Sequence, residues 1–319
     1  MSDSDTTYTE AAFDHDVVVV GGGPAGCAAG IFTARYGLDT VIFDRGRSSI
    51  QRCAHLENYL GFPAGIDIET LYELMHDHAE EAGCEIVPDL VESLERTDDG
   101  EGFIIDLQGV VPITARRVIA ATRYDGEYMR GLDDEAAMFE THEHDGEEHE
   151  HFDKGYAESD GTTPVDDLFI ASPYGDTGYQ ALMAAGRGAR TAISVVEAVR
   201  RERGYPDSLA NYYDWVRRET ELEDESAARN RWREHFDDRV ADDHGLEEAR
   251  LAELRDREID RRIEMYISDD EIDRRGERGQ ERLLEHIDDE LILDAARAIE
   301  AERRTATSNN GEPTARDSR

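Results

Sequence analysis

Apolar and polar residues alternate in blocks at the start of the chain, and glycines separate the first two blocks. Residues 17–20 are four valines, residues 27–36 are compatible with a helix, and a second apolar run covers 40–43. Short apolar runs bounded by turn residues are typical of buried strands. Strands that alternate with helices indicate a parallel sheet. The pattern therefore predicts a βαβ unit over residues 16–44.

Further along the chain the pattern predicts more of the same sheet and a small antiparallel part. After a loop over 45–63, the spacing of apolar residues predicts a helix over 68–82, strands over 84–87, 117–122 and 165–171, and a helix over 179–201. Apolar stretches at 90–94, 103–107 and 110–113 predict an antiparallel element, in which Asp98-Asp99-Gly100 is a hairpin signal. The predicted fold class is therefore α/β, a Rossmann-like parallel sheet with a small antiparallel element.

The segment 140–161 has no hydrophobic period and is rich in acidic residues and histidine, which predicts a solvated loop. Its histidines could in principle bind a transition metal together with nearby glutamates: His142, His144, His149 and His151. A solvated loop has no framework to hold ligands in place. We therefore interpret the segment as a loop and predict no metal site.

The last third of the chain is highly charged, with helical periodicity. One apolar stripe comprises Leu251, Leu254, Ile259, Ile263 and Ile267, and a second comprises Leu283, Leu284, Ile287, Leu291, Ala295 and Ile299. Amphipathic helices of this kind dock against another surface, which makes a homodimer one expectation. The predicted organisation is a disordered lead-in over 1–13, a nucleotide-binding domain over 14–204 interrupted by the acidic loop 133–164, a helical extension over 205–304, and a disordered tail over 305–319.

The charge balance changes the expected environment. The 319 residues include 75 acids and 35 bases, for a net charge of −40, and Lys154 is the one lysine. Self-repulsion of this size is screened at high salt, so we expect a halophilic-type protein. The charge argues against nucleic acid and anionic membranes as partners. The N-terminal residues resemble no signal peptide, and no apolar run approaches the roughly 20 residues of a spanning helix. We therefore expect a cytoplasmic protein.

The glycines after the first strand carry the most specific chemistry. Gly21, Gly23 and Gly26 fit the pattern G-x-G-x-x-G, and Asp44 ends the next strand 18 positions after Gly26. In such a turn the glycines allow a tight bend, a close approach of pyrophosphate and close packing of the following helix. The helix N-terminus attracts the phosphates, and the acidic residue binds a ribose. The pattern predicts a dinucleotide site.

Several further motifs occur in an order that resembles one family, the FAD domain of low-molecular-weight thioredoxin reductases and related flavoprotein oxidoreductases. The resemblance covers roughly residues 13–199, and rests also on His55-Leu-Glu-Asn-Tyr-Leu-Gly-Phe-Pro63, Val118-Ile-Ala-Ala-Thr122, Leu168-Phe-Ile-Ala171 and Gln180-Ala181. It implies FAD as the cofactor. The implied binding residues are Gly21, Gly23, Pro24, Ala25, Gly26, Asp44, Arg45, Asn58, Ala121, Thr122, Gln180 and Ala181.

The sequence also departs from that family. Only residues 123–164 stand where the family has an NADPH domain, and neither a second glycine fingerprint nor a C-x-x-C occurs. Arg123 replaces a family glycine. The family's Gly-Asp pair aligns with Ser172-Pro173, although a shifted alignment would use Gly175-Asp176. Losing that aspartate removes a hydrogen bond of about 1–3 kcal/mol, which weakens FAD binding without abolishing it.

Three cysteines, Cys27, Cys53 and Cys84, form no disulfide framework. Cys53 and His55 precede Asn58 in the loop expected near the flavin, so a thiolate activated by His55 is a candidate for redox chemistry. A loop cysteine without a redox role is the simpler interpretation. Cys27 and Cys84 are expected to be inert core residues.

Two functions remain open at this stage. The first is a FAD-dependent oxidoreductase that takes electrons from an external donor: a ferredoxin, a thiol or NAD(P)H. The alternative is a non-catalytic protein of the same fold that acts as an interaction module through its helical extension. A third interpretation places NAD in the single site, because Asp44 is compatible with NAD, but the Glu57-Asn58 loop favours flavin.

Overall fold

The computed structural model of the chain describes residues 13–46, 48–123, 126–144, 147–172, 174–175, 180–222, 224–240 and 244–309. The chain divides into two compact units, residues 1–266 and 267–319, which are described separately below. The first unit thus includes the predicted nucleotide-binding domain and the 62 residues that follow it. The predicted domain boundary after residue 204 stays a prediction, and the division into compact units falls after residue 266.

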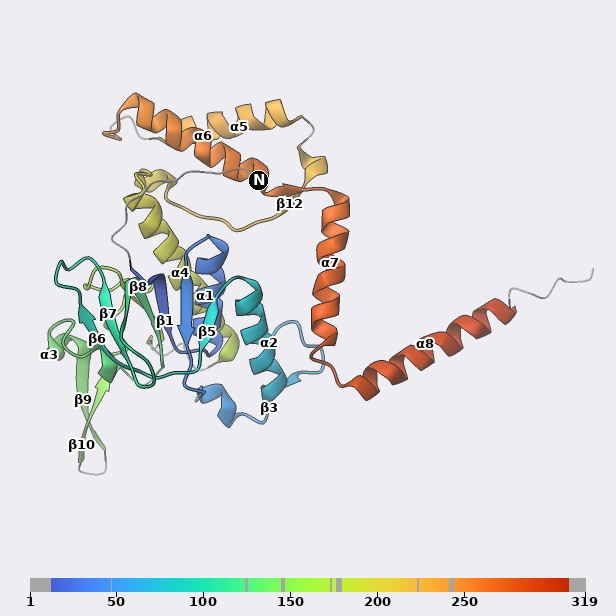
Figure 1. The fold of residues 1–319 in the computed structure, drawn as a ribbon, viewed down its shortest axis with the longest axis horizontal. Coiled ribbons are helices and arrows are strands. Elements are labelled where there is room, and N and C mark those ends of the chain that lie inside the picture. The colour runs from blue at the N-terminus through green and yellow to red at the C-terminus, as the bar shows by residue number, and fades with distance from the viewer. Residues whose placement is uncertain are drawn as a thin grey trace, which may run out of the picture. The chain divides into compact units, whose positions relative to one another are not determined.

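A parallel sheet forms the centre of the first unit (Figure 1). Its hydrogen-bonded order is β5-β2-β1-β8, and β11 pairs with the second half of β8. The parallel strands are β1 (His15–Val20), β2 (Thr40–Phe43), β5 (Glu85–Val87), β8 (Ile113–Ala121) and β11 (Leu168–Ser172). The predicted βαβ unit is therefore confirmed, because β1 pairs with β2 in parallel register from Val17 opposite Thr40 to Val20 opposite Phe43.

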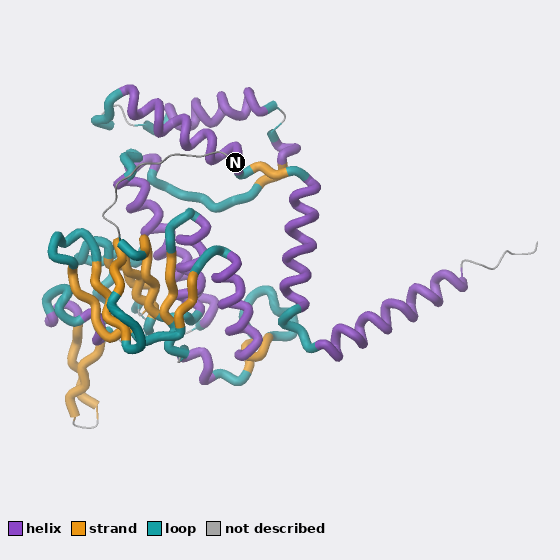
Figure 2. The backbone as a smooth tube through the Cα atoms, in the orientation of Figure 1, coloured by secondary structure: helices purple, strands orange, loops and turns teal. Residues whose placement is uncertain are grey.

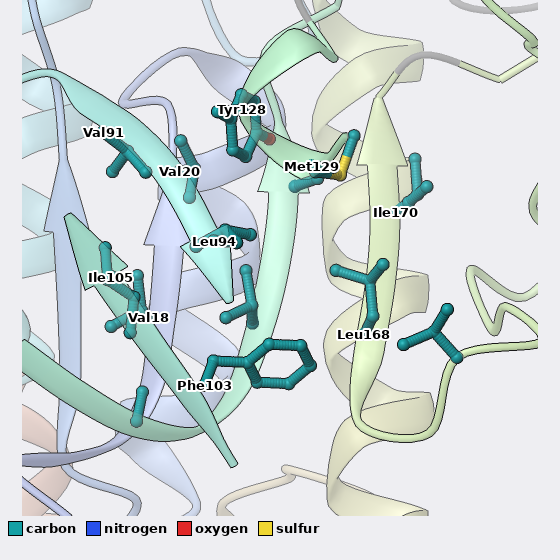
Figure 3. Packing of buried hydrophobic residues seen from close by; sticks show 14 of the residues in the cluster. Val18, Val20, Val91, Leu94, Phe103, Ile105, Tyr128, Met129, Leu168 and Ile170 are labelled. Carbon is teal, nitrogen blue, oxygen red and sulfur yellow. The ribbon is translucent and has the colours of Figure 1, made fainter. Parts of the chain in front are cut away.

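The two faces of the sheet bury different layers because successive side chains of a strand point to opposite sides. Val17 and Val19 of β1 belong to a core shared with helices α1 (Pro24–Arg35) and α4 (Ala181–Glu202). Val18 and Val20 belong to a second core, beneath the antiparallel hairpin. Figure 3 shows this second core, in which Val91, Leu94 and other apolar side chains of the hairpin meet β1 and β11. All four valines are buried, which explains the continuous apolar run.

Helices cover one face of the sheet (Figure 2). They are α1 (Pro24–Arg35), α2 (Ile68–Glu81) and α4 (Ala181–Glu202). Asp67 caps α2 by accepting a hydrogen bond of 2.9 Å from the Thr70 backbone N–H. α1 and α4 lie in close contact, because an added Cβ at Gly188 of α4 would be 1.9 Å from the Ala25 carbonyl oxygen. The predicted helices at 68–82 and 179–201 are confirmed to within two residues.

The antiparallel element is confirmed in part. β6 (Val91–Arg96) and β7 (Phe103–Leu107) form the predicted hairpin around Asp98-Asp99-Gly100. The third predicted stretch, 110–113, is wrong as a separate strand. Val110 and Val111 are exposed, and Ile113 begins β8, which pairs with β7 at its start and with β1 along most of its length. The nine-residue strand β8 therefore belongs to both the parallel and the antiparallel part of the sheet.

The solvated loop predicted at 140–161 is wrong for its first half. The structure has a short helix α3 (Glu135–Met138) and a hairpin of β9 (Phe139–His144) and β10 (Glu147–Phe152). Phe139 and Phe152 are paired at the base of the hairpin, with ring centroids 5.7 Å apart, and both are buried in the core. Burial of these two rings stabilises the hairpin, although the strand residues between them are polar. The side chains of 142–149 lie outside the described residues, so the metal prediction stays untested.

The remaining elements up to residue 267 are short strands, 3₁₀ turns and two further helices. They are β3 (His55–Leu56), β4 (Ile66–Asp67), β12 (Arg217–Arg218), α5 (Glu225–Asp237), α6 (Glu248–Glu264) and β13 (Tyr266–Ile267), together with 3₁₀ turns at 49–52, 127–129, 207–209 and 219–221. Leu251 and Leu254 of α6 are buried with Phe236 of α5 and with Tyr205. The first predicted stripe therefore docks on neighbouring parts of the same chain.

The second unit contains α7 (Asp269–Leu284) and α8 (Asp289–Asn309). α8 extends through 305–309, where the sequence predicts a tail. Ser268 caps α7 by accepting from the Glu271 backbone N–H at 3.2 Å. The second stripe is exposed at Leu283, Ile287 and Leu291, so its docking against a second copy stays a prediction. Across the described residues, no helix is both long and apolar enough to cross a lipid bilayer.

Candidate nucleotide-binding site

The glycine turn between β1 and α1 is held against the end of β8. Gly21 has a φ of +113°, and an added Cβ there would be 2.7 Å from the Ala121 carbonyl oxygen. An added Cβ at Gly26 would be 1.7 Å from the Gly21 carbonyl oxygen. Both positions therefore require glycine for steric reasons. No side chain caps the N-terminus of α1, and Pro24 occupies its first turn, so the helix end is open to an anion.

A cavity of about 250 Å³ lies in front of this turn. Gly21, Gly22 and Gly23 line it on one side, and Ala121, Thr122 and Arg123 line it at the end of β8. Asp44 and Arg45 complete the predicted lining residues. Val20, Val91 and Tyr128, which gather at one end of the core in Figure 3, also line it. The ends of β1, β2 and β8 thus meet at one cavity, as expected for a dinucleotide site at the carboxyl edge of a parallel sheet.

Other residues of the cavity were not anticipated from the sequence. They are Gly22, Ser48, Ser49, Arg52, Asp89, Leu90, Val91 and Tyr128. Most of them follow a strand end, so the strand assignments could have pointed to the segments after 43 and after 87. Tyr128 does not follow a predicted strand, so the sequence did not point to it. It lies in a 3₁₀ turn whose position depends on the packing of Met129 in the core.

Asp44 is held by two side chains from α2. The Tyr72 hydroxyl donates to its Oδ2, and His76 Nε2 lies 3.4 Å from the same oxygen. The backbone N–H of Gly46 donates to Oδ1 at 3.0 Å. His76 Nε2 is also 3.0 Å from the Gly22 carbonyl oxygen, which can only accept, so this nitrogen carries a proton. Burial, and then the hydrogen bond to Asp44, raise the pKa of the Tyr72 phenol. α2 therefore orients the carboxylate beside the glycine turn.

Arg123 adopts the left-handed backbone conformation, with a φ of +65°. This conformation favours glycine, the residue that the resembling family has there. The Arg123 guanidinium donates to Ser49 Oγ at 2.7 Å and lines the cavity. The chain thus keeps the turn geometry while placing a cation at the site.

Asn58 and the start of α4 meet beside α1. Asn58 Nδ2 donates to Gln180 Oε1 at 3.0 Å. Ala181 packs against a small apolar cluster that includes Cys27 of α1 and Leu56. Two motifs separated by 122 positions are therefore brought together, although neither lines the cavity at the glycine turn. Pro24, Ala25 and Gly26 also lie outside its lining and are buried in α1.

The cysteines separate into two kinds. Cys53 is exposed, whereas Cys27 and Cys84 are buried. Burial, and secondarily the Asp44 carboxylate, raise the pKa of the Cys27 thiol to about 12, and burial raises the pKa of Cys84 to about 12. The expectation that these two are inert core residues agrees with their burial. His55 is exposed and pairs with Asp67 in the short β3–β4 ladder, and no described contact joins it to Cys53.

Comparison with known proteins agrees with this geometry. Residues 15–151 match the family described as pyridine nucleotide-disulphide oxidoreductase. NADPH-dependent thioredoxin reductase 3 of Arabidopsis thaliana is 39% identical over 88 residues, 26% of this chain and 17% of that protein. Thioredoxin reductase of Streptomyces clavuligerus is 34% identical over 110 residues, 34% of each chain. The matches thus span about a third or less of these relatives.

A thioredoxin reductase structure from Gloeobacter violaceus covers 64% of this chain at 19% identity, with a TM-score of 0.49. Residues 15–151 are thus similar in sequence to a pyridine nucleotide-disulphide oxidoreductase domain, and the relatives that match are thioredoxin reductases. The matched region runs from β1 to β10, so it contains the glycine turn, Asp44 and the end of β8.

Proposed function

We propose that this protein is a FAD-dependent oxidoreductase that receives its electrons from an external donor. The observation that carries the proposal is the cradle of Gly21, Gly22 and Gly23 at the open N-terminus of α1. An added Cβ at Gly23 would be 2.7 Å from Ser48 Oγ, so this position has no room for a side chain. The second glycine of such a turn is where a pyrophosphate approaches the backbone.

The residues present fit a flavin dinucleotide. Backbone N–H groups at the start of α1 would bind the pyrophosphate, Asp44 would accept from the adenosine ribose, and Arg123 would supply a cation to the phosphates. Asn58 and Gln180, held together beside α1, would orient the flavin end. When bound, FAD supplies the hydride or electron chemistry, and this chain supplies position and electrostatics.

The proposal of an external donor rests on what the sequence contains. Neither a second glycine fingerprint nor a C-x-x-C occurs in the 319 residues. We therefore propose that a ferredoxin, a reduced thiol or freely diffusing NAD(P)H delivers the electrons. The acidic surface makes a nucleic acid or an anionic membrane an unfavourable partner. We also propose that the protein is cytoplasmic and works at high salt.

The decisive experiment is a visible absorption spectrum of the protein purified in concentrated KCl, followed by analysis of any cofactor released on denaturation. We expect a flavin spectrum with FAD in a one-to-one ratio, and bleaching by one of the three donors. Gly23→Ala in a Ser48→Ala background should lower FAD affinity at least tenfold, because the Cβ blocks the approach of the pyrophosphate. Ser48→Ala alone is the matched control and should keep FAD. A folded protein that refuses added FAD would refute the proposal.

One observation favours a second candidate, a non-catalytic interaction module. Asp44 Oδ2 already accepts from Tyr72, and Arg123 holds a strained conformation next to the turn. If these contacts exclude the dinucleotide, the fold would serve as a platform for the helical extension. The variant Tyr72→Phe distinguishes the two candidates. If the wild type binds no FAD and the variant does, the hydrogen bond from Tyr72 prevents FAD binding. If neither form binds FAD, the interaction module is favoured.

A further inference from the structure

A second cavity lies in the part of the first unit that follows α4. Its volume is about 280 Å³, and residues from the segment 213–217, from α5 and from the end of α6 line it. The segment is tied to the far end of α1, because Arg35 Nη2 donates to Asp214 Oδ1 at 2.8 Å. α1 has 12 residues, so the cavity is separated from the glycine turn by about a helix length, ~18 Å. It is therefore distinct from the nucleotide site.

Aromatic rings form much of the wall. They belong to Tyr213, Trp215, Trp232 and Tyr266. The centroids of Tyr213 and Trp215 are 5.7 Å apart, and Trp215 is 59% exposed. A large aromatic side chain is normally buried, so an exposed one beside a cavity indicates a surface suited to a flat apolar partner.

The charged side chains of this cavity are all basic. Arg217, Arg239 and Arg262 line it beside His235, whose pKa is lowered by burial and by the charges of Arg239 and Arg262. Its described lining contains no carboxylate, although 75 of the 319 residues are acidic. The charge of these guanidinium groups is opposite in sign to the net charge of the chain, which is −40. The cavity is therefore a local attractor for an anion.

Two of the arginines are held in place by neighbours, and the third makes no such contact with the described residues. The Arg262 guanidinium carbon lies 4.4 Å from the Trp232 ring centroid, and Arg262 Nε donates to Glu258 at 2.9 Å. Arg217 Nη1 donates to the Tyr266 hydroxyl at 3.2 Å. Among the described residues, the Arg239 guanidinium makes no hydrogen bond or ion pair, and its charge lowers the pKa of the neighbouring His235. Two held arginines, Arg217 and Arg262, beside Arg239, which has no such partner among the described residues, suit recognition of a single anionic group.

We propose that this arginine–aromatic pocket binds a small planar anion, an aromatic ring that carries a carboxylate. The ring would stack against Trp215 and Trp232, and the Arg239 guanidinium would pair with the carboxylate, which matches its planar fork of donors. The inference is independent of FAD binding, because it rests on side chains at the opposite end of α1.

The protein carries its own reporter for this pocket. Its two tryptophans, Trp215 and Trp232, both line the cavity. Benzoate is the probe, titrated into the full chain at constant ionic strength while tryptophan emission is recorded. We expect a saturable change with benzoate. Benzyl alcohol, which has the ring without the charge, and acetate, which has the charge without the ring, should each bind at least about tenfold more weakly.

Arg239→Gln should weaken benzoate binding about tenfold or more, and the fold should persist because Arg239 is exposed. Arg233→Gln is the matched control, an exposed arginine on the same helix α5 that contacts Asn230 and does not line the pocket. Trp215→Leu leaves Trp232 as the sole reporter and should also weaken binding. Equal affinities for benzoate and benzyl alcohol, no saturable change, or full affinity in Arg239→Gln would each overturn the proposal.

Discussion

Arg200 of α4 and Glu258 of α6 form an ion pair in the interior of the first unit, with Nη2 and Oε2 separated by 3.0 Å. The two residues are 1% and 5% exposed. Glu258 also accepts from Arg261 at 2.7 Å and from Arg262 at 2.9 Å. This network joins the predicted extension to the nucleotide-binding fold. It gives a physical reason why the compact unit continues to residue 266.

Replacing Glu258 by Gln should destabilise the protein by about 3 kcal/mol, because it leaves the buried Arg200 guanidinium without its counter-charge. Chemical denaturation at neutral pH measures the loss. Asp260→Asn is a suitable control on the same helix, since it removes an exposed pair with Arg229 and should cost no more than about 1 kcal/mol. A loss for Glu258→Gln as small as that of the control would contradict the structural role.

The same carboxylate predicts a pH dependence. Burial by itself would raise its pKa, but the hydrogen bond from Arg261 and the charges of Arg200, Arg261 and Arg262 lower the pKa of Glu258 to about 2. A lowered pKa contributes stability that is present above the unfolded value of about 4.5 and is lost as the pH falls toward 2. The stability difference between the wild type and Glu258→Gln should therefore shrink between these two pH values. A constant difference would contradict the assignment.

Gly188→Ala should destabilise the protein by about 3 kcal/mol or more, because the added Cβ would be 1.9 Å from the Ala25 carbonyl oxygen. Gly186→Ala is the matched control in the same helix, since an added Cβ there meets nothing within 4 Å. It should stabilise by about 0.5–1 kcal/mol through helix propensity. Thermal denaturation of both variants tests the pair, and similar melting temperatures would show that α1 and α4 do not approach this closely.

The strain at Arg123 can be measured by comparing two variants that both lack the guanidinium. Arg123→Gly removes the penalty for a φ of +65°, whereas Arg123→Ala keeps it. The glycine variant should be more stable than the alanine variant by about 1 kcal/mol, despite its greater freedom in the unfolded chain. Denaturation midpoints at the same salt concentration provide the comparison. An alanine variant as stable as the glycine variant would mean that residue 123 is not in the left-handed region.

Thiol chemistry should distinguish Cys53 from the other two cysteines. In the native protein at neutral pH, a maleimide should modify Cys53 rapidly, because its side chain is exposed. Cys27 and Cys84 should react at least a hundredfold more slowly, since burial raises their pKa values to about 12 and few thiolates form. Mass spectrometry of the labelled protein counts the sites. All three should react after unfolding, and rapid labelling of Cys27 in the native state would contradict its position in the core.

The strongest local signals predicted the centre of the fold. The four valines of β1 and the glycines after them specify a buried strand and a tight turn through short-range sterics alone. Asp98-Asp99-Gly100 likewise predicted a hairpin. The acidic hairpin at 139–152 was missed because its stability comes from Phe139 and Phe152 at its base, which pack into a core formed by distant strands. A window of residues contains no information about such partners.

The sequence by itself determined the βαβ unit and the glycine turn, because each depends on neighbours within a few positions. Only the tertiary structure decided that Tyr72 and His76 hold Asp44, that Asn58 meets Gln180, and that Arg200 pairs with Glu258. These contacts join residues 28 to 122 positions apart. They depend on how whole helices pack, and packing is a property of the folded chain rather than of any one segment.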